Sequence, residues 1–406
     1  MAQQPQPNVP YQSMNEPSSA LNKVKNAFKT GKAFVQENIN AKFGFVSSAI
    51  SIGGLFVLIV VIIVVTYTFI RDYTLQYNER RSINTIETAR KLQSIKQTLQ
   101  TQPLRNFYIK TALNCCSLGD WNSNYVDLLA LQYAIVQGYR CLDFEIYSMN
   151  NKPVVAVSSD KKNFNHTETF NQLDFGEVCA KINDAAFSLA PNSGDPLLIS
   201  LRIKSNNPSP AFVKGIIDGI TRFGDRLLGP DNNYENGGQN LSKHPVSEFM
   251  GKVIIVADVS NPLTTSNCAS TDQNCLHQYI NIGTNSPFLH KLEYEMGVKN
   301  TPNMDTLIDH NKKNMSIVFP DPPYRVNTNF NVAKVFGCQL IGMMPQLKDA
   351  NLEMYNDFFN KEGCAFALKP TELCYQPVVI ETPPPQNPDV SFAGRNYSTD
   401  YASWSV

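Results

Sequence analysis

The longest apolar stretch of the chain lies between Lys42 and Arg71, where no residue is charged and residues 55–65 are almost entirely aliphatic. This stretch exceeds the roughly 20 residues that an α-helix needs to cross a bilayer. It is also too long, and begins too far from the N-terminus, for a cleaved signal peptide. The pattern therefore predicts a transmembrane helix over residues 43–70.

The segments before this helix are polar at first and then basic. Residues 1–20 are rich in Gln, Pro and Ser without apolar periodicity, which predicts a disordered tail. Residues 21–42 place Leu21, Val24 and Phe28 at helical spacing among five lysines. That pattern is typical of a basic amphipathic helix on an anionic membrane surface, and equally of a mobile juxtamembrane segment. The lysine excess favours a cytoplasmic N-terminus.

After the predicted membrane helix the pattern changes twice. Residues 71–102 are polar, lack Pro and Gly, and carry Ile and Leu in partial helical register, which predicts a stalk helix that ends at Pro103. Beyond it, short apolar runs alternate with helical segments, which argues for a parallel α/β sheet or barrel rather than a sandwich. The runs are residues 197–201, 252–257, 316–319 and 339–343, and the helical segments are residues 127–137, 175–189 and 212–228. This domain is predicted over residues 103–376, before a Pro-rich tail over residues 377–406.

The composition excludes some classes of function but does not indicate a fold. The 406 residues include 35 Lys and Arg against 35 Asp and Glu, so the chain has no net field that would attract nucleic acid or a polyanionic substrate. All nine cysteines lie at or beyond Cys115, and their spacing matches neither a zinc site nor a complete disulfide framework. We therefore expect no nucleic-acid partner and no metal bound through Cys.

Two acids alternate with large apolar residues in residues 138–147, a pattern that predicts a strand. With a side-chain period of two, Asp143 and Glu145 share one face of this strand, and Leu142 and Phe144 share the other. Such a pair could bind a cation, share a proton or pair with a base. The alternative is an acid pair neutralised by a nearby Arg or Lys, and the pattern alone leaves both open.

Six segments, taken in order, carry a resemblance to a known family. They are FYIKTALN (107–114), GYRCLDFE (138–145), PLLISL (196–201), GKVII (251–255), GCQL (337–340) and GCAFALKP (363–370). Together they resemble the catalytic barrel of the phosphoinositide-specific phospholipases C of eukaryotes, over roughly residues 103–370. The resemblance implies an α/β fold, namely an irregular TIM-type (β/α) barrel of the phospholipase C-like phosphodiesterase kind.

The resemblance also implies a chemistry in which two histidines transfer protons while a calcium ion stabilises the attacking hydroxyl and the phosphate of an inositol lipid. Leu113 stands at the position of the first histidine, and Ser159 stands at that of the second. Leu cannot accept a proton, and a Ser hydroxyl does not replace an imidazole near neutral pH. Both acid/base positions are thus degenerate, and no catalytic residue is expected.

The family's calcium ligands fall at Asn114, Asp143, Glu145 and a glutamate position that Arg202 occupies in this chain. A divalent ion about 4 Å from a guanidinium would be repelled by roughly 8 kcal/mol at an effective dielectric constant near 20. Calcium is therefore disfavoured as a cofactor, and no metal is expected. We expect instead that the Arg202 guanidinium takes the place of the ion and donates hydrogen bonds to Asp143 and Glu145.

The substrate positions that the resemblance implies have changed as well. The family's phosphate-binding lysines fall at Val256 and Asp258, and its arginine and tyrosine beside the substrate fall at Ile317 and Phe319. Each of these positions is apolar or acidic here, so the pocket is not expected to attract a phosphoinositide headgroup. A relocated base such as His166 is the alternative, although a lone loop histidine is far more often solvated than catalytic.

Two hypotheses of different classes remain. The first is a single-span membrane protein whose degenerate barrel, a pseudoenzyme, serves as a structural or protein-binding module. The second is an active, metal-independent phosphodiesterase on lipid or glycerophosphodiester headgroups, which leaves Leu113 and Ser159 unexplained. The expected partners are the lipid bilayer and a protein or a second copy, which could associate through the membrane and stalk helices by the small residues Ala49 and Gly53. A permanent anchor suits a receptor, a scaffold or a component of a virion membrane.

Overall fold

The computed structural model describes residues 25–33, 45–84, 92–119, 124–160, 163–205, 208–234, 239–258, 275–323, 325–377, 387 and 393–406. The predicted tail over residues 1–20 lies outside this part of the chain. The side chains of Ala49 and Gly53 also lie outside it, so helix association through them stays a prediction.

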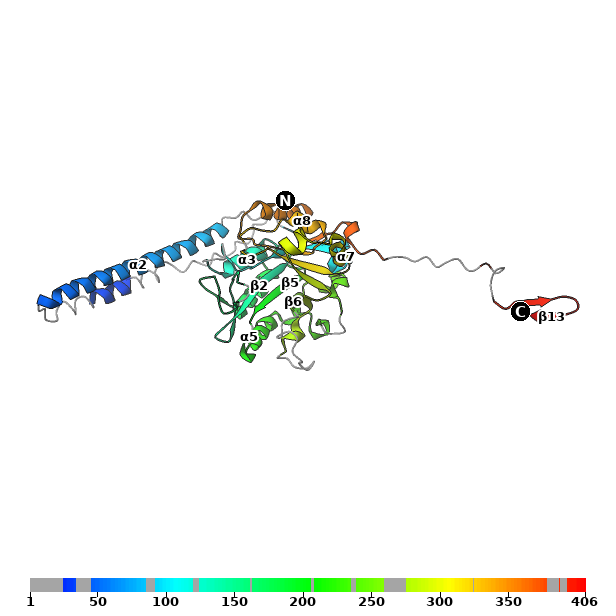
Figure 1. Cartoon of the computed structure of the whole chain (residues 1–406), viewed down its shortest axis with the longest axis horizontal. Coiled ribbons are helices and arrows are strands. Elements are labelled where there is room, and N and C mark those ends of the chain that lie inside the picture. Colours follow the sequence, from blue (N-terminus) through cyan, green and yellow to red (C-terminus); the bar gives the residue numbers. More distant parts are fainter. Residues whose placement is uncertain are drawn as a thin grey trace, which may run out of the picture.

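One long helix, α2 (Phe45–Asn84), covers the predicted membrane helix and continues beyond it. The most apolar window of 18 residues within Gly54–Asn78 has a mean hydropathy of 2.5, and the rest of the protein buries none of that window. A core helix of a soluble protein would bury such a stretch. Figure 1 shows α2 running away from the barrel, so it is long, apolar and exposed enough to cross a bilayer.

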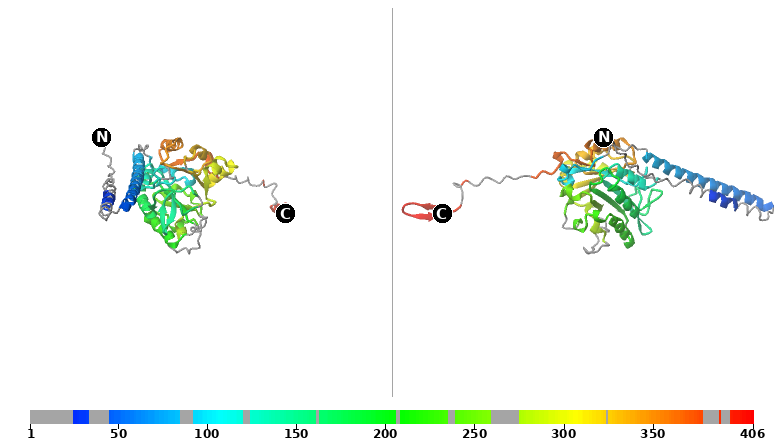
Figure 2. Two further views of the ribbon diagram at one scale, coloured as in Figure 1. Left: turned by 60° about the vertical axis from the view of Figure 1, so that its left-hand side comes forward. Right: turned by 180° about the vertical axis from the view of Figure 1, so that it is seen from behind.

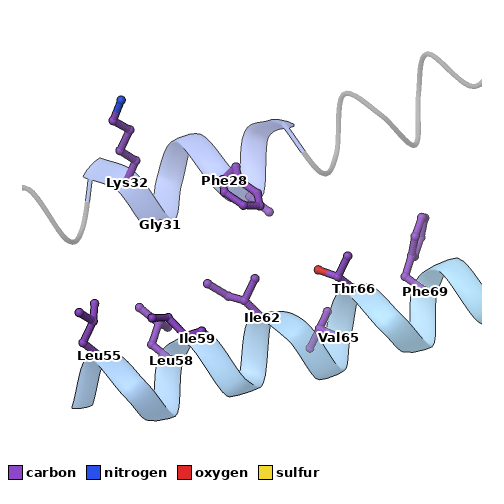
Figure 3. A pocket seen from close by; sticks show the side chains of 11 residues that line it. Phe28, Gly31, Lys32, Leu55, Leu58, Ile59, Ile62, Val65, Thr66 and Phe69 are labelled. Carbon is purple, nitrogen blue, oxygen red and sulfur yellow. The ribbon is translucent and has the colours of Figure 1, made fainter. Parts of the chain in front are cut away.

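Residues 25–33 form a short helix beside α2, inside the segment predicted to be basic and amphipathic. Figure 3 shows that Phe28 points toward α2 whereas Lys32 points away from it. The groove between the two helices is lined on the α2 side by Leu55, Leu58, Ile59, Ile62, Val65, Thr66 and Phe69. Leu21 and Val24 lie outside the described residues, so the amphipathic character of residues 21–42 and their position on a membrane surface stay predictions.

The predicted stalk helix over residues 71–102 continues α2 as far as Asn84 and is wrong from Leu92 onwards, and residues 85–91 lie outside the described part of the chain. From Leu92 onwards the chain belongs to the barrel: Leu92 and Ile95 are each only 3% exposed, and the Ile95 N–H donates to Asp195 Oδ1 at 2.9 Å. The apolar residues in partial helical register thus pack against the barrel instead of lining one face of a helix. The barrel unit therefore includes residues 92–102, before the predicted boundary at Pro103.

Within the described residues, eight parallel strands form a nearly closed barrel. They are β1 (Phe107–Ala112), β2 (Cys141–Met149), β5 (Leu197–Lys204), β6 (Val253–Asp258), β7 (Ile282–Thr284), β8 (Leu289–Glu293), β9 (Met315–Phe319) and β10 (Leu340–Met343). Their order is β7-β6-β5-β2-β1-β10-β9-β8, and β7 and β8 stand at the two ends of this order. The parallel α/β barrel predicted from the sequence is confirmed.

Three short strands extend this sheet. β3 (Lys152–Val155) pairs antiparallel with β2, β4 (Leu173–Asp174) pairs with β3, and β11 (Phe366–Leu368) pairs antiparallel with β1. The hairpin of β2 and β3 matters for function because it carries the chain from the acid pair to Ser159.

Helices connect the strands, and most begin at a side chain that caps the first turn. They are α3 (Leu128–Val136), α4 (Phe175–Ala186), α5 (Pro210–Ile220), α7 (Met304–Lys313), α8 (Phe330–Val335) and α9 (Ala350–Glu362). Short helical turns are η1 (Gln97–Leu99), η2 (Leu104–Asn106), η3 (Thr221–Arg226), η4 (Pro230–Asn232), η5 (Leu241–Lys243), η6 (Val246–Phe249), η7 (Leu276–Tyr279), η8 (Tyr294–Lys299) and η9 (Thr371–Leu373). The helix predicted over residues 212–228 stops at Ile220 and is followed by the turn η3, within which Gly224 takes a φ of 54° that no α-helix contains.

The C-terminal segment contains a hairpin that the sequence analysis missed. Strands β12 (Asn396–Ser398) and β13 (Ser403–Ser405) pair antiparallel, and the rings of Tyr397 and Trp404 stack at 5.6 Å. Figure 2 shows this hairpin away from the barrel, within the predicted Pro-rich tail. The alternation of Tyr397, Ser398 and of Ser403, Trp404 is the pattern that would have predicted it.

Candidate functional site

The predicted acid pair lies on β2, directly beside the polar face of β5. The two strands are parallel, with Asp143 opposite Ser200 and Glu145 opposite Arg202. Because side chains alternate along a strand, these four share one face of the sheet. That face is the inside of the barrel, since Arg202 Cζ lies 5.1 Å from the ring centroid of Phe319 on β9, across the barrel.

The Arg202 guanidinium lies between the two acids, and the hydrogen bonds that we expect there are present. Nη1 donates to Glu145 Oε1 at 2.5 Å. Nε and Nη2 both donate to Asp143 Oδ1, at 2.9 Å and 2.6 Å, and Nη2 also donates to Asn114 Oδ1 at 2.6 Å. All three guanidinium nitrogens are therefore engaged by the residues that stand at the family's metal-ligand positions.

The remaining carboxylate oxygens have partners too. Asp143 Oδ2 accepts a hydrogen bond from the Ser200 hydroxyl at 2.9 Å. Glu145 Oε2 accepts from the Tyr147 hydroxyl at 2.7 Å and from the Ser158 N–H at 3.1 Å. Every oxygen of the buried pair is thus hydrogen-bonded, as buried carboxylates require.

Charge is balanced within the same cluster. Asp143 and Glu145 are both 0% exposed, and Arg202 is 9% exposed. Lys204 Nζ adds a second positive charge 3.9 Å from Glu145 Oε1. Burial lowers the pKa of Lys204, and Glu145 acts against that shift. Two acids and two bases meet here, so the cluster needs no further ion to be neutral.

These residues do not fit a calcium ion. Calcium binds oxygen ligands at 2.3–2.6 Å in a shell of six to eight. Here the oxygens of Asp143, Glu145 and Asn114 that would form such a shell lie 2.5–2.9 Å from guanidinium nitrogens of Arg202. Within the described residues, no group of three or more His, Cys, Asp and Glu side chains could hold a metal ion.

Leu113 and Asn114 follow β1 directly. Leu113 is 0% exposed and its N–H donates to the Met343 carbonyl at 2.7 Å, so the side chain at the first histidine position is part of the core. Asn114 adopts a φ of 48°, a left-handed conformation that Asn tolerates better than most residues. This turn directs the Asn114 side chain to Arg202 and places Leu113 against Gly342 on the neighbouring strand β10.

Ser159 lies in the loop after β3, and its neighbourhood is acidic. Its N–H donates to Glu168 Oε2 at 2.5 Å, and the Ser158 hydroxyl donates to the same oxygen at 3.4 Å. Glu168 and Tyr147 were both missed by sequence reasoning. Tyr147 could have been found, because it follows Glu145 at a spacing of two on the same strand, whereas no local pattern connects Glu168 to the site.

The four substrate positions lie on two strands, Val256 and Asp258 on β6 and Ile317 and Phe319 on β9. Val256 and Ile317 are fully buried apolar residues, and Asp258 accepts a hydrogen bond from Asn285 Nδ2 at 2.7 Å. Val256 lies opposite Ser200 in the register of β5 and β6, and the Phe319 ring lies 5.1 Å from Arg202 Cζ. Lys291 Nζ on β8 lies 5.8 Å from the Phe319 ring centroid; burial lowers the pKa of this lysine, and Arg202 lowers it further. Sequence reasoning missed Lys291.

Four of the five histidines contact residues elsewhere in the protein. His166 is exposed, His244 Nδ1 lies 2.9 Å from Glu248 Oε2, and His277 packs against Tyr234. The rings of His290 and His310 stack at 3.5 Å. Burial lowers the pKa of His310 to about 4, and its Nε2 lies 2.9 Å from the Met315 carbonyl oxygen. Among the described contacts, none brings an imidazole to the acid pair.

Comparisons with known proteins agree with this barrel. Residues 100–258 match the family model for the X domain of phosphatidylinositol-specific phospholipase C. The chain is similar in structure to PLC21 of S. officinalis, with 17% identity, a TM-score of 0.54, and coverage of 67% of this chain and 37% of that one. For PLC21 of L. pealei the values are 15%, 0.53, 67% and 38%. This chain thus spans less than half the length of those proteins, and the likeness shows the fold alone. The search of curated protein sequences found no match.

Proposed function

Since the chain carries a phospholipase C-like barrel, we propose that it is a single-span membrane protein whose barrel has lost catalysis and serves as a structural or protein-binding module. The observation that carries the proposal is the Arg202 guanidinium between Asp143 and Glu145. A group that hydrogen-bonds both acids leaves neither carboxylate available as a base or as a metal ligand.

Phosphodiester cleavage needs a base within reach of the attacking hydroxyl and an acid for the leaving group. At the first of these positions the chain has Leu113, fully enclosed in the core. At the second it has Ser159, whose backbone is held by Glu168. Neither side chain transfers protons near neutral pH, so this barrel lacks both the general base and the general acid. It also has no role for a calcium ion.

The membrane part of the proposal rests on α2, whose apolar stretch is exposed along its length. The lysines before α2 favour an N-terminus on the cytoplasmic side, with the barrel on the other side. A barrel held permanently beside a bilayer fits a receptor, a scaffold or a virion-membrane component. With the barrel interior closed by the acid–arginine cluster, the surface available for binding consists of the outer helices and loops. Such a surface suits a protein partner.

The experiment is a turnover assay on the full chain reconstituted in nanodiscs. Labelled phosphatidylinositol in the bilayer and glycerophosphoinositol in solution are supplied with and without calcium. The expected result is no product above that of the matched Asp143→Asn variant. Turnover by the wild-type chain that Asp143→Asn or Arg202→Ala abolishes would overturn the proposal in favour of a metal-independent phosphodiesterase.

A further inference from the structure

The motif Asn-x-Ser/Thr, the acceptor sequence for N-linked oligosaccharides, begins at Asn165, Asn240, Asn314 and Asn396. Several such motifs arise by chance in a chain rich in asparagine, so the motif alone does not assign a modification. An attached oligosaccharide is bulky and hydrophilic, and a folded protein accommodates it only where the asparagine side chain faces solvent. The burial and the hydrogen bonds of each asparagine therefore decide which motif is compatible with a glycan.

Two of the four asparagines are built into the barrel. Asn240 is only 7% exposed, and its Nδ2 donates to Asn314 Oδ1 at 2.8 Å while its Oδ1 accepts from the Ser242 hydroxyl at 2.6 Å. Asn314 directly precedes β9, where the hydroxyl of the fully buried Ser316 donates to Asn311 Oδ1 at 2.6 Å. An oligosaccharide on either asparagine would disrupt the contact between the two side chains, so neither position is compatible with the folded barrel.

Asn396 is exposed, but its motif is engaged within the C-terminal hairpin. Its Oδ1 accepts from the Ser405 hydroxyl at 2.5 Å, and the Ser398 and Ser403 hydroxyls lie 2.8 Å apart. The motif is recognised through its hydroxyl as well as its amide, which is why its third residue is Ser or Thr. Both groups are bonded to the partner strand here, so this motif is less accessible than its exposure suggests.

Asn165 meets both conditions. It lies in the loop after β3, in neither a helix nor a strand, and both Asn165 and His166 are exposed. The Asn165 backbone N–H donates to Asn163 Oδ1 at 3.2 Å, which shapes the turn. Among the contacts of the described residues, none engages the side-chain amide of Asn165. This motif ends in Thr167, so both the amide and the hydroxyl that recognition needs belong to an irregular surface loop.

Two independent observations favour a barrel outside the cytoplasm, where such a modification takes place. Cys275, directly before η7, is disulfide-bonded. Disulfides persist in secreted proteins, in the endoplasmic reticulum and on cell or virion surfaces, and they are rare in the cytosol. Residues 21–42 contain five lysines and one acid, Glu37, and an excess of lysine keeps that side of a membrane span in the cytoplasm. The barrel, which follows α2, then lies on the other side.

We propose that Asn165 carries an N-linked oligosaccharide. The inference rests on the proposed function, because it needs the membrane span and the barrel on the far side of it. The donor is an oligosaccharide linked to a lipid through a diphosphate. Asn165 Nδ2 forms a bond to the anomeric carbon of the sugar and loses one proton, while the bond from that carbon to the diphosphate oxygen breaks. The lipid diphosphate leaves with the electron pair of that bond.

A glycan on Asn165 would stand beside the acid–arginine cluster. The ring centroid of the preceding residue, Phe164, lies 5.4 Å from Lys204 Nζ, and that nitrogen lies 3.9 Å from Glu145 Oε1. The loop also supplies Ser158, whose N–H donates to Glu145 Oε2 at 3.1 Å. A bulky hydrophilic group there would keep lipid headgroups away from the carboxyl-terminal end of the barrel. The modification therefore agrees with a barrel that has lost catalysis.

The test uses the full chain, expressed in cultured animal cells and digested with peptide N-glycosidase before gel electrophoresis. Digestion should increase the mobility of the wild type, and mass spectrometry of the digested chain should locate the resulting aspartate at position 165. Asn165→Gln and Thr167→Ala should abolish the shift, because each removes one half of the motif from an exposed loop. Thr167→Ser is the matched control, since it keeps the hydroxyl and should retain the shift.

A wild-type chain whose mobility the glycosidase leaves unchanged, or a shift that Asn165→Gln retains, would overturn the inference. Protease protection in sealed microsomes from the same cells separates this failure from that of the proposed function. A protected barrel without a glycan contradicts only the modification of Asn165. A barrel that the protease digests, in a chain that resists alkaline carbonate extraction, contradicts the proposed orientation as well, and a chain that carbonate releases contradicts the span itself.

Discussion

The barrel buries charged side chains at both of its ends but neutralises them in different ways. At the carboxyl end, Arg202 bonds two carboxylates, and charge is balanced by charge. At the amino end, Lys110 is 0% exposed and its Nζ donates to the Gln137 carbonyl at 3.0 Å, 4.6 Å from the Tyr139 ring centroid. Here a backbone carbonyl and an aromatic face take the place of a counter-ion.

The bases buried at the amino end have lowered pKa values, because burial without a close counter-ion disfavours their charged forms. Burial lowers the pKa of Lys110 to about 7 and that of Lys369 to about 8. It also lowers the pKa of Arg140 to about 10, although Asp195 acts in the opposite direction. A single buried base can be accommodated by giving up its proton, whereas the acid pair needs its arginine. The carboxyl end is therefore the region whose charges depend on one another.

The largest effect should come from removing Arg202. Arg202→Ala leaves two fully buried carboxylates without their main partner, which should lower the free energy of unfolding by about 3–5 kcal/mol. Arg202→Lys keeps the charge and should lose less. Replacing the whole cluster by Asp143→Asn, Glu145→Gln and Arg202→Met should recover part of the loss. Denaturant unfolding of the four proteins measures this order, and an Arg202→Ala chain as stable as the wild type would contradict it.

The next effect is a pH dependence from Lys110. Its folded pKa of about 7 lies below the unfolded value of about 10.4, so between these values the unfolded chain binds more protons and stability rises with pH. The free energy of unfolding should rise by about 1.4 kcal/mol per pH unit from this group. Lys110→Met should remove that slope, measured by unfolding between pH 7.5 and 9.5. The exposed Lys214→Met is the control, and a slope that Lys110→Met leaves unchanged would show that Lys110 is not the titrating group.

A smaller loss of stability is expected when one hydrogen bond of the cluster is removed and all of its charges are kept. Tyr147→Phe removes the hydroxyl that donates to Glu145 Oε2 at 2.7 Å but leaves Arg202 in place. The expected loss is about 1–2 kcal/mol, because Glu145 keeps its other donors. Thermal unfolding measures it, and a loss as large as that of Arg202→Ala would mean that hydroxyl bonding and not charge pairing holds the acids.

The smallest effect is expected at the surface. Lys214 and Asp218 form an i,i+4 pair at 2.7 Å, with both side chains more than half exposed. Solvent screens such pairs, so Lys214→Ala should change the free energy of unfolding by no more than about 0.5 kcal/mol. A change above 1 kcal/mol in the same unfolding assay would remove the distinction between buried and exposed pairs on which the comparison depends.

The period-two pattern of the strands carried much of the correct prediction. It places Asp143 and Glu145 on one face of a strand, and in the structure that face meets Ser200 and Arg202 inside the barrel. The partners that come from loops could not be found in this way. Glu168 reaches the site through a loop whose path depends on tertiary packing, and Lys291 comes from the far wall of the barrel.

The prediction of a stalk helix was wrong for a related physical reason. Leu92 and Ile95 have the spacing of one helix face, but the same spacing serves a chain that lies against a barrel and inserts single apolar residues. Periodicity reports that a residue is buried without saying what buries it. The ion pair of Arg80 with Asp127 joins residues that are 47 positions apart, and no local pattern contains it.

The central claim is that the Arg202 guanidinium takes the place of a metal ion between Asp143 and Glu145. It is tested most directly by thermal unfolding of the full chain across a calcium titration, for the wild type and for Arg202→Glu. We expect no calcium-dependent stabilisation of the wild type, whereas calcium should stabilise Arg202→Glu and the further change Asp143→Asn should remove that stabilisation. Calcium-dependent stabilisation of the wild-type chain that Asp143→Asn abolishes would contradict it.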